Sequence, residues 1–357
     1  MRRRATGWTH KLRTSPGIES LIKIHFDWIN SGELNALADI RENIGLIACN
    51  RGAFHLPLDM FSRIMADRNV LFRIGHPVGE APLPLTPHPQ IAEGISKDYD
   101  ALLDSRKRAG QGTDSIGPID PLRQAFVRLA TCICFDFILT HEAAHISRGH
   151  VGLLKNSAGI PFIVETAPRP AHLDMMTWQA IEFDADAQAG GHSLANLFQS
   201  AKAKEPDSWP AEYEAICPNA EAIVFAWNFA IAGLFHLWGV KVDFNSLESG
   251  DHPPTGMRYG MLANATEQVV RIFHPEILPR IGEIAFFAYS MMRYSLLRLG
   301  VDRRAVIHPD DLSFVLMDRR TTNHAKKISD RLHAINPELA KFSYDKQMPD
   351  RSTNPHA

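Results

Sequence analysis

The sequence predicts a mainly α fold of the α+β class, with a central helix, a second helix that bears carboxylates, and a small N-terminal sheet. Residues 122–148 contain neither proline nor glycine, and their apolar side chains recur at helical spacing. Asp120 can cap this helix, Pro121 suits its first turn, and Gly149 can end it. A second helix is expected at about 174–189, whereas short apolar segments near the N-terminus are typical of strands.

Composition argues against several classes of protein. The chain has 357 residues, 45% of them apolar and 22% charged, as in a soluble globular protein of one large or two modest domains. The formal net charge of -2 lacks the basic excess of a nucleic-acid-binding protein, so no nucleic-acid partner is expected. The four cysteines are too few and too scattered for a disulfide scaffold, and we interpret them as reduced core thiols. Nothing in the composition indicates an oligomeric state.

One segment has the length and composition of a membrane span. Residues 222–240 are almost wholly apolar, but Asn228 and His236 interrupt them, and a buried core helix explains the segment equally well. Three arginines follow Met1 without an apolar stretch after them, so this is not a secretory signal. We expect a cytoplasmic protein, with membrane association left open but not favoured.

The part of the chain before the central helix carries most of the expected strands. In order, the pattern predicts a helix at about 18–29, an amphipathic segment at 34–40, a hairpin with strands at 43–49 and 53–56 around a turn at 50–52, a strand at 70–74, a helix at 91–108 and a surface loop at 109–119. An extended peptide can add to the edge of such a sheet, which would suit a substrate-binding role.

The candidate site begins with an H-E-x-x-H motif in the central helix, made by His141, Glu142 and His145. Two histidines at i and i+4 lie on one helix face, where both neutral rings can reach one zinc ion at about 2.0–2.1 Å. Glu142 is placed to take a proton from a water activated by that zinc. A chance match is the alternative, because the chain contains 17 histidines.

The second helix supplies a candidate for the third ligand. Glu182 and Asp186 are i and i+4 and share a helix face, so Glu182 can complete a His2Glu zinc site with one position open for water. Asp186, one turn on, is placed to accept the other ring N–H of a zinc-binding histidine. The alternative is a solvated acidic face, and Asp184 has no assigned role. Gly190 and Gly191 are expected to end or kink this helix.

A further histidine motif follows the apolar segment. In the loop at 251–258, His252 would lie at the mouth of the site with Arg258 on the first turn of the next helix, where either can stabilise an oxyanion. A simple turn is the alternative for this His-Pro pair. His150, near the end of the central helix, is expected to contact its last carbonyl groups. The remaining pattern predicts a strand at 161–165, helices at 268–273, 281–299 and 321–335, and a disordered tail at 345–357.

Taken in order, H-E-x-x-H at 141–145, E-x-x-A-D at 182–186 and H-P-P-x-x-x-R at 252–258 resemble the motifs of the glutamate-zincin peptidases, especially the HtpX-like and CAAX-prenyl-protease-like group. The first motif is also similar to that of the Lit-type phage-exclusion peptidases. The resemblance covers roughly residues 120–260. It implies a zincin-like catalytic core that binds Zn2+, with the following residues in its site: His141, His145 and Glu182 as ligands, Glu142 as general base, Asp186 in support of a ligand histidine, and His252 and Arg258 near the oxyanion.

These expectations divide the chain into four parts and indicate a function. Residues 1–119 form an α+β segment packed on the core with the substrate-binding sheet, 120–260 form the zinc peptidase core, 261–344 form a C-terminal helical segment, and 345–357 form the tail. We predict a zinc-dependent endopeptidase that hydrolyses a protein or peptide substrate with a metal-activated water and a glutamate base. The alternative is a non-catalytic metal-binding or helical interaction protein, in which the acidic and histidine residues are structural.

Overall fold

The computed structural model describes residues 22–42, 44–80, 98–108, 117–159, 162–164, 173–204, 209–238, 247, 252–253, 255–300 and 319–344. The following parts of the expected structure lie outside these residues: the start of the helix at 18–29, the start of the helix at 91–108, most of the loop at 109–119, and the tail at 345–357.

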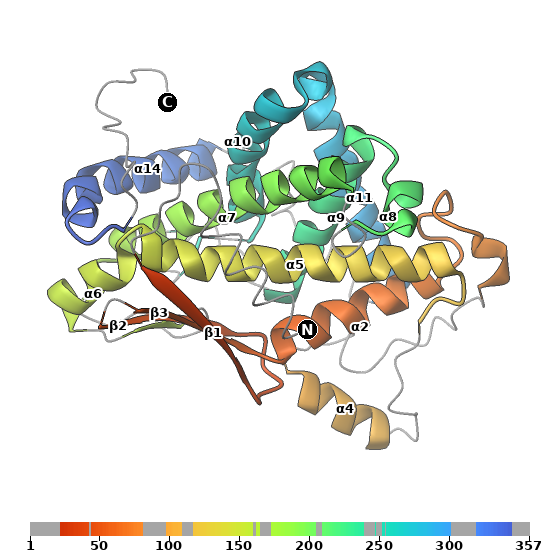
Figure 1. Cartoon of the computed structure of the whole chain (residues 1–357), viewed down its shortest axis with the longest axis horizontal. Helices are drawn as coiled ribbons and strands as arrows, with labels where there is room; N and C mark the ends of the chain where they lie inside the picture. The colour runs from red at the N-terminus through yellow and green to blue at the C-terminus, as the bar shows by residue number, and fades with distance from the viewer. Residues whose placement is uncertain are drawn as a thin grey trace.

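Helix α5, Pro121–Ser147, runs through the middle of the molecule (Figure 1). The side chain of Asp120 caps it by accepting hydrogen bonds from the backbone N–H groups of Leu122, at 2.9 Å, and Arg123, at 3.0 Å. Pro121 occupies the first turn, where its missing N–H leaves no helical bond unmade. The sheet packs on one side of α5 and α7 packs on the other (Figure 1). Because of this packing, α5 is buried over most of its length.

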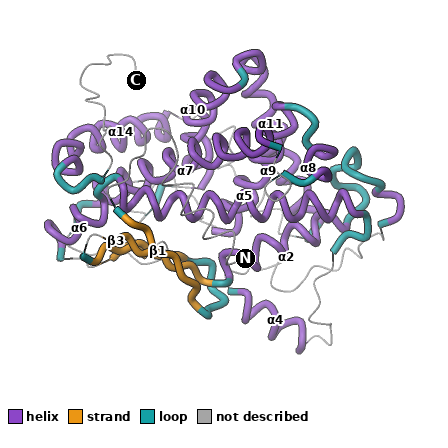
Figure 2. Tube along the Cα trace, viewed as in Figure 1, coloured by secondary structure: helices purple, strands orange, loops and turns teal. Residues whose placement is uncertain are grey.

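A four-stranded sheet lies beside α5 (Figure 2). Its strands are β1 (Lys23–Ile29), β2 (Ala36–Arg41), β3 (Ile44–Asn50) and β4 (Phe162–Val164), in the spatial order β1-β3-β2-β4. Strand β1 is parallel to β3, whereas β2 is antiparallel to both β3 and β4. The small N-terminal sheet is therefore confirmed, and so is the strand expected at 161–165.

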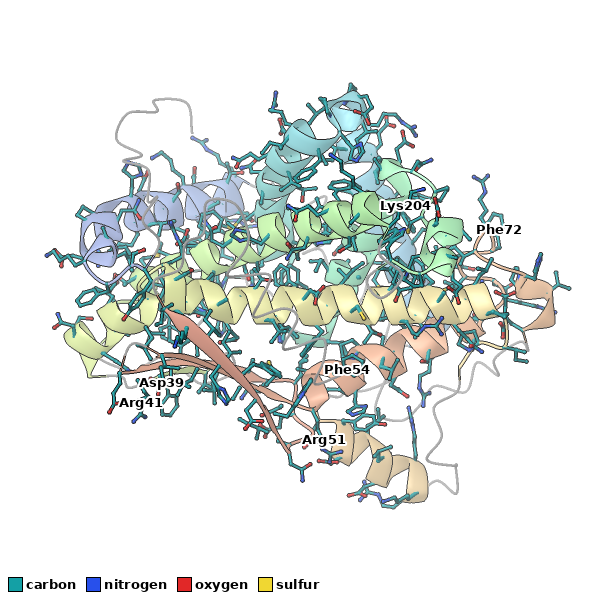
Figure 3. The ribbon with its side chains drawn as sticks, viewed as in Figure 1. Asp39, Arg41, Arg51, Phe54, Phe72 and Lys204 are labelled. Carbon is teal, nitrogen blue, oxygen red and sulfur yellow. The ribbon has the colours of Figure 1, made fainter. Side chains whose placement is uncertain are left out.

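Three elements expected in the N-terminal part are wrong. Residues 23–29 form strand β1 rather than helix, and alternate side chains on it are exposed, with Ile24, Phe26 and Trp28 turned toward the core. The expected second strand of the hairpin, 53–56, belongs instead to helix α2, Gly52–Ala66. The structure begins this helix directly after β3, and Phe54 on its first turn packs on Phe135 of α5 with ring centroids 5.9 Å apart (Figure 3).

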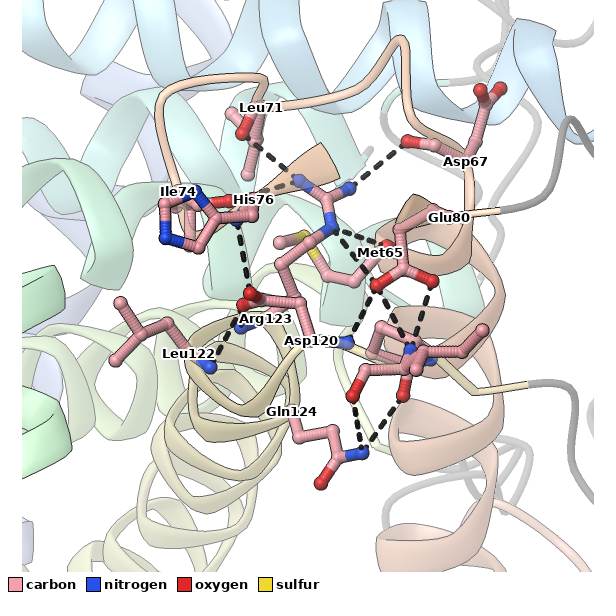
Figure 4. A network of polar contacts seen from close by, with 12 residues as sticks. Met65, Asp67, Leu71, Ile74, His76, Glu80, Asp120, Leu122, Arg123 and Gln124 are labelled. Atoms are coloured by element: carbon pink, nitrogen blue, oxygen red, sulfur yellow. Dashed lines mark hydrogen bonds and ion pairs between the residues drawn. The ribbon is translucent and has the colours of Figure 1, made fainter. Parts of the chain in front are cut away.

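The third wrong element is the strand expected at 70–74, which is a series of turns. The guanidinium of Arg123 explains why, because it holds the backbone of this segment in a curve (Figure 4). It donates to five carbonyl oxygens at 2.7–3.2 Å, those of Met65, Asp67, Val70, Leu71 and Ile74. Carbonyl groups turned toward one cation cannot also pair along a sheet.

Helices build the rest of the molecule. They are α4 (Tyr99–Arg108), α6 (His150–Ala158), α7 (Met175–Ala203), α8 (Ala211–Ile216), α9 (Ala220–Trp238), α10 (Thr255–Phe273), α11 (Ile281–Arg298) and α14 (Arg319–Ala340), with short 3-10 turns η1 (Pro77–Gly79) and η2 (Pro275–Arg280). The mainly α class with a small sheet is thus confirmed.

Helix α7 continues through Gly190 and Gly191, so the end that was one of the two expectations for this pair is wrong. A Cβ at Gly190 would lie 2.8 Å from Cδ2 of Leu262 on α10, so the glycine allows α10 to approach α7 closely. Helices α10 and α14 both pack on α7, and they cover its side away from α5 (Figure 1).

Helix α9 is the one helix, within the described part of the chain, that is long and apolar enough to cross a membrane. In the most apolar stretch of it, 72% is buried inside the protein, against α5 and α11 among others. This burial is what a core helix shows, and length and composition alone are weak evidence for a span.

Candidate metal centre

Three side chains from two helices converge in the core. His141 and His145 come from α5, and Glu182 comes from α7, each between 0 and 1% exposed. Nε2 of His141 lies 3.0 Å from Nε2 of His145 and 3.4 Å from Oε2 of Glu182. Nε2 of His145 lies 3.7 Å from Oε1 of Glu182. The structure therefore brings together the residues expected as metal ligands.

These separations fit one metal ion. Two ligands of a tetrahedral zinc at about 2.0–2.1 Å lie about 3.3 Å from each other. The distances of 3.0, 3.4 and 3.7 Å, of which the last two go to different oxygens of Glu182, bracket that value. One ligand atom from each of the three residues lies within 4.8 Å of the others. The buried His141, His145 and Glu182 could thus hold a metal ion, and two nitrogens with one carboxylate oxygen are a donor set that suits zinc.

Two of the three side chains, His145 and Glu182, have the ionisation states that a metal needs. Burial lowers the pKa of His145 well below its ordinary value, so the ring is neutral and carries a lone pair. Burial alone would oppose ionisation of Glu182, but the adjacent imidazoles of His145, His141 and His252 outweigh it and hold its pKa well below normal. Glu182 is therefore a carboxylate at neutral pH.

Formal charge around the three ligands also favours a cation. The buried carboxyl side chains here are Glu142, Glu182, Asp184 and Asp186, and the buried guanidinium groups are Arg148 and Arg258. Formal negative charges exceed formal positive charges by two among these buried side chains. Since an uncompensated buried charge is very costly, a divalent cation would restore neutrality.

Asp186 stands behind His141, as expected from its position one turn after Glu182. Its Oδ1 lies 3.0 Å from Nδ1 of His141. Burial raises the pKa of Asp186, but the charge and the hydrogen bonds of Arg258 outweigh this and keep the carboxyl ionised. A carboxylate at this place favours the His141 tautomer with a proton on Nδ1, which leaves the Nε2 lone pair for a metal.

Arg258 occupies a different place from the expected one near an oxyanion. Its Nε and Nη2 donate to the two oxygens of Asp186, at 2.6 and 2.8 Å. The guanidinium carbon lies 5.2 Å from the ring centre of Phe235 and 4.9 Å from that of Trp238, so α9 encloses the charge with aromatic faces. The geometry makes Arg258 a support for Asp186 rather than a group that faces the metal position.

His252 lies at the edge of the site and is its most exposed residue, with 15% of the side chain accessible. Its Nδ1 is 3.6 Å from Oε2 of Glu182, and its ring is 6.5 Å from that of Trp178. It does not belong to the group whose donor atoms all lie within 4.8 Å of one another. Among the described residues, a metal held here would have three protein ligands, and His252 lies beside one of them, Glu182.

Glu142 is 1% exposed. Glu142 lies near Cys49 at the end of β3. Burial, and then the charge of Glu142, raise the pKa of the Cys49 thiol well above its ordinary value. The glutamate expected as general base is thus buried near the end of β3.

Three further residues of the site were not expected there from the sequence: Arg148, His150 and Asp184. The contact expected between His150 and helix carbonyls is wrong, since its ring is fully buried and faces His145 and Asp184. Asp184 in turn accepts from Nε of Arg148 at 2.8 Å. The signal available in the sequence was Gly149, which adopts φ of 84° and lets the chain turn between α5 and α6, so that His150 points back at the site.

No protein-family model, curated protein or solved structure matches this chain. The resemblance to the glutamate-zincin peptidases accordingly rests on the motifs and their spacing.

Proposed function

We propose that this protein is a zinc-dependent endopeptidase in which His141, His145 and Glu182 bind the metal. The convergence of the three side chains carries this proposal, since one ligand atom from each lies within 4.8 Å of the others and the nearest separations, 3.0, 3.4 and 3.7 Å, are close to those of ligands that share one tetrahedral ion. The buried excess of formal negative charge and the neutral His145 support it. Three protein ligands with one open position are typical of catalytic rather than structural zinc.

Each residue around the metal has a defined task in this mechanism. Bound zinc would polarise the scissile carbonyl and lower the pKa of a water molecule to about 7. Glu142 takes the proton of the attacking water and delivers it to the leaving amine. His252, beside the open position, donates to the oxyanion that forms on the carbonyl. Asp186, held by Arg258, orients His141.

The substrate of the proposed enzyme is a protein or peptide in extended conformation. The order of the sheet leaves β1 and β4 at its edges, and an extended peptide can pair with the free N–H and C=O groups of an edge strand. Trp28 of β1 stacks on Phe135 of α5 with ring centroids 5.1 Å apart, which fixes the β1 edge against the metal-binding helix. This proposed binding mode would place a substrate backbone along the element that carries the catalytic motif.

The test compares wild type with Glu142→Gln. We expect both proteins to contain about one zinc by elemental analysis, because Glu142 is not a ligand. We expect only wild type to generate new N-termini in proteome-wide N-terminal profiling of expressing cells. Glu338→Gln, a change of the same kind on exposed α14 surface, should behave as wild type.

Two results would overturn the proposal. Wild type purified with zinc in the medium could contain none, which would remove the metal site itself. Alternatively, wild type and Glu142→Gln could give the same N-termini, which would remove the catalytic role of Glu142 while leaving zinc binding intact.

A second function, a non-catalytic metal-binding protein, is favoured by the burial of the site. His141, His145, Glu182 and Glu142 are all at most 1% exposed, whereas a catalytic centre has to admit a substrate. In this case a chelator would lower the melting temperature of wild type and of Glu142→Gln by the same amount, and neither would produce new N-termini.

A further inference from the structure

A chain of buried polar groups leads away from the metal position behind His145. Nδ1 of His145, the ring nitrogen opposite the one that faces His141, lies 3.1 Å from Nδ1 of His150. Nε2 of His150 lies 3.2 Å from Oδ2 of Asp184. Arg148 ends the chain by donating to both oxygens of Asp184, at 2.8 and 3.3 Å. All four side chains are buried.

Asp184 determines where the protons of this chain lie. A guanidinium can only donate, and Arg148 donates to both oxygens of Asp184, at 2.8 and 3.3 Å, so this carboxyl pairs with it as a carboxylate. An ionised carboxylate can only accept hydrogen bonds, so His150 must donate to it from Nε2. The neutral His150 ring then has no proton on Nδ1, and that nitrogen accepts the Nδ1 proton of His145.

We propose that His150 is a positioning residue that holds His145 in the tautomer with Nδ1 protonated, so that the Nε2 lone pair of His145 points at the zinc position. This inference rests on the zinc site of the proposed function. The opposite arrangement would place a proton on Nδ1 of His150 and force the proton of His145 onto Nε2. That proton would point toward Nε2 of His141, only 3.0 Å away, and would exclude a metal ion.

The surrounding structure keeps His150 in this place. Gly149 takes a left-handed conformation that L side chains rarely adopt, and it makes His150 the first residue of α6 rather than a continuation of α5. Farther along α6, Nζ of Lys155 donates to Oδ1 of Asp39 at 2.7 Å and so ties α6 to β2 (Figure 3). The start of α6 is thus fixed by the turn at Gly149, and its second turn is fixed by the contact between Lys155 and Asp39. The His150 ring therefore has little freedom to move away from His145.

The two zinc histidines therefore have separate supports. Behind His141 stand a carboxylate, Asp186, and a guanidinium, Arg258. Behind His145 the same two kinds of group, Asp184 and Arg148, stand one residue farther away, because His150 lies between. Loss of an outer hydrogen-bond partner typically weakens metal binding by about 10- to 100-fold. The support at His145 should have an effect of that size.

The first test measures zinc affinity by competition with a chromophoric chelator. His150→Phe keeps a ring of similar size but removes the acceptor, and we expect its zinc affinity to fall about 10- to 100-fold. His150→Gln has a side-chain carbonyl that can accept from Nδ1 of His145, so it should stay within a few-fold of wild type. His333→Phe, at an exposed position of α14, serves as the matched control and should not change the affinity.

The second test reads the tautomers directly, by NMR of protein labelled with 15N-histidine. Wild type should show His150 protonated at Nε2 and His145 protonated at Nδ1, with and without zinc. In Asp184→Asn the new amide can donate to Nε2 of His150, which would move the His150 proton to Nδ1. This variant should lose at least as much zinc affinity as His150→Phe.

The outcomes separate this proposal from the proposed function. If wild type binds no zinc, the proposed function fails, and the tautomers of the zinc-free protein still decide the role of His150. If wild type binds zinc but His150→Phe binds it equally well, or if His150 carries its proton on Nδ1, the positioning role is wrong and the zinc site stands. Thermal unfolding of each zinc-free variant shows whether it folds, and for one that does not, His150→Gln and the wild-type tautomers give the answer.

Discussion

Arg258 donates two hydrogen bonds to the carboxylate of Asp186, from Nε at 2.6 Å and from Nη2 at 2.8 Å. The pair is buried, and two aromatic rings of α9 flank the guanidinium. A planar guanidinium matches both carboxylate oxygens at once, so it fixes the rotation of Asp186 as well as its charge. Through Asp186, Arg258 of α10 thereby reaches His141 on α5, although none of the three proposed ligands comes from α10.

The first prediction concerns Arg258→Lys. A lysine keeps the positive charge but cannot form two parallel hydrogen bonds, so Asp186 should lose its fixed orientation and zinc affinity should fall about tenfold. Chelator competition measures this fall. Arg271→Lys on the same helix, where the arginine pairs with Glu267 in an exposed position, is the control and should leave the affinity unchanged. Normal zinc affinity with lost hydrolysis in Arg258→Lys would instead indicate that Arg258 faces the oxyanion.

A second prediction concerns the acid sensitivity of the fold through His236 on α9. Burial, and then the charge of Arg293, lower the pKa of His236 from 6.5 to about 4 in the folded protein. Above pH 6.5 both states are neutral and stability is at its full value. As the pH falls from 6.5 toward 4, only the unfolded chain takes up the proton, so the free energy of unfolding decreases by at most about 3 kcal/mol.

His236→Phe should remove that part of the pH dependence, because a phenyl ring can keep the stack on Tyr289 and cannot be protonated. Chemical denaturation of wild type and variant at pH 7, 6, 5 and 4 measures the difference. The gap between the two unfolding free energies should shift in favour of the variant as the pH falls. The exposed His333→Phe should follow the wild-type curve, and a His236→Phe curve parallel to wild type would contradict the prediction.

The third prediction concerns Arg123, whose guanidinium serves five backbone carbonyl groups between residues 65 and 74. Arg123→Met keeps much of the buried stem but leaves these acceptors without their donor, and we expect a loss of at least about 3 kcal/mol in unfolding free energy. Arg123→Lys should fall between, since an ammonium has three donors where arginine has five. Arg128→Met, on an exposed face of the same helix, should cost less than about 0.5 kcal/mol. Equal stability of the two methionine variants would show that the carbonyl groups need no cation.

The contacts of Arg123 also show why the turns at 70–74 could not be predicted from the sequence, although α5 could. The signals that specify α5 are local: the cap at Asp120, the proline after it and the uninterrupted helical spacing. Spacing of i and i+4 likewise predicted that His141 shares a helix face with His145, and Glu182 with Asp186. The turns at 70–74 depend instead on a side chain about fifty residues farther along the chain, and no local pattern announces it. Apolar side chains fill the core whether such a segment forms a strand or turns, so their pattern alone does not distinguish the two.

The same limit applies to the site. Glu182 and the first two histidines follow from periodicity, but His150 reaches His145 only because the chain reverses at Gly149. Arg258 was assigned from its distance along the chain to His252, whereas its position depends on how α10 packs on α7. Tertiary packing of this kind involves residues far apart in sequence, so spacing within one motif does not determine it.

The fourth prediction compares the two glycines that flank α6. Gly149 and Gly159 both have positive φ, 84° and 65°. Among the described residues, a Cβ at Gly159 would meet nothing within 4 Å, whereas a Cβ at Gly149 would lie 2.5 Å from the carbonyl oxygen of Leu339 and 2.8 Å from the N of Ser343. The chain after α14 comes this close because Tyr344 N and Ser343 Oγ both donate to the carbonyl oxygen of Ser147, at 2.9 and 2.8 Å.

Gly159→Ala therefore measures backbone strain alone and should cost about 1 kcal/mol of unfolding free energy. Gly149→Ala adds a collision with backbone atoms that cannot yield without undocking the C-terminal segment, so it should cost at least about 2 kcal/mol more. It should also displace His150 and lower zinc affinity, whereas Gly159→Ala should not. Thermal unfolding and chelator competition on the two variants measure both effects. Equal losses of stability would show that the C-terminal segment does not press on Gly149, and unchanged zinc affinity in Gly149→Ala would show that this turn does not hold the metal-binding histidine in place.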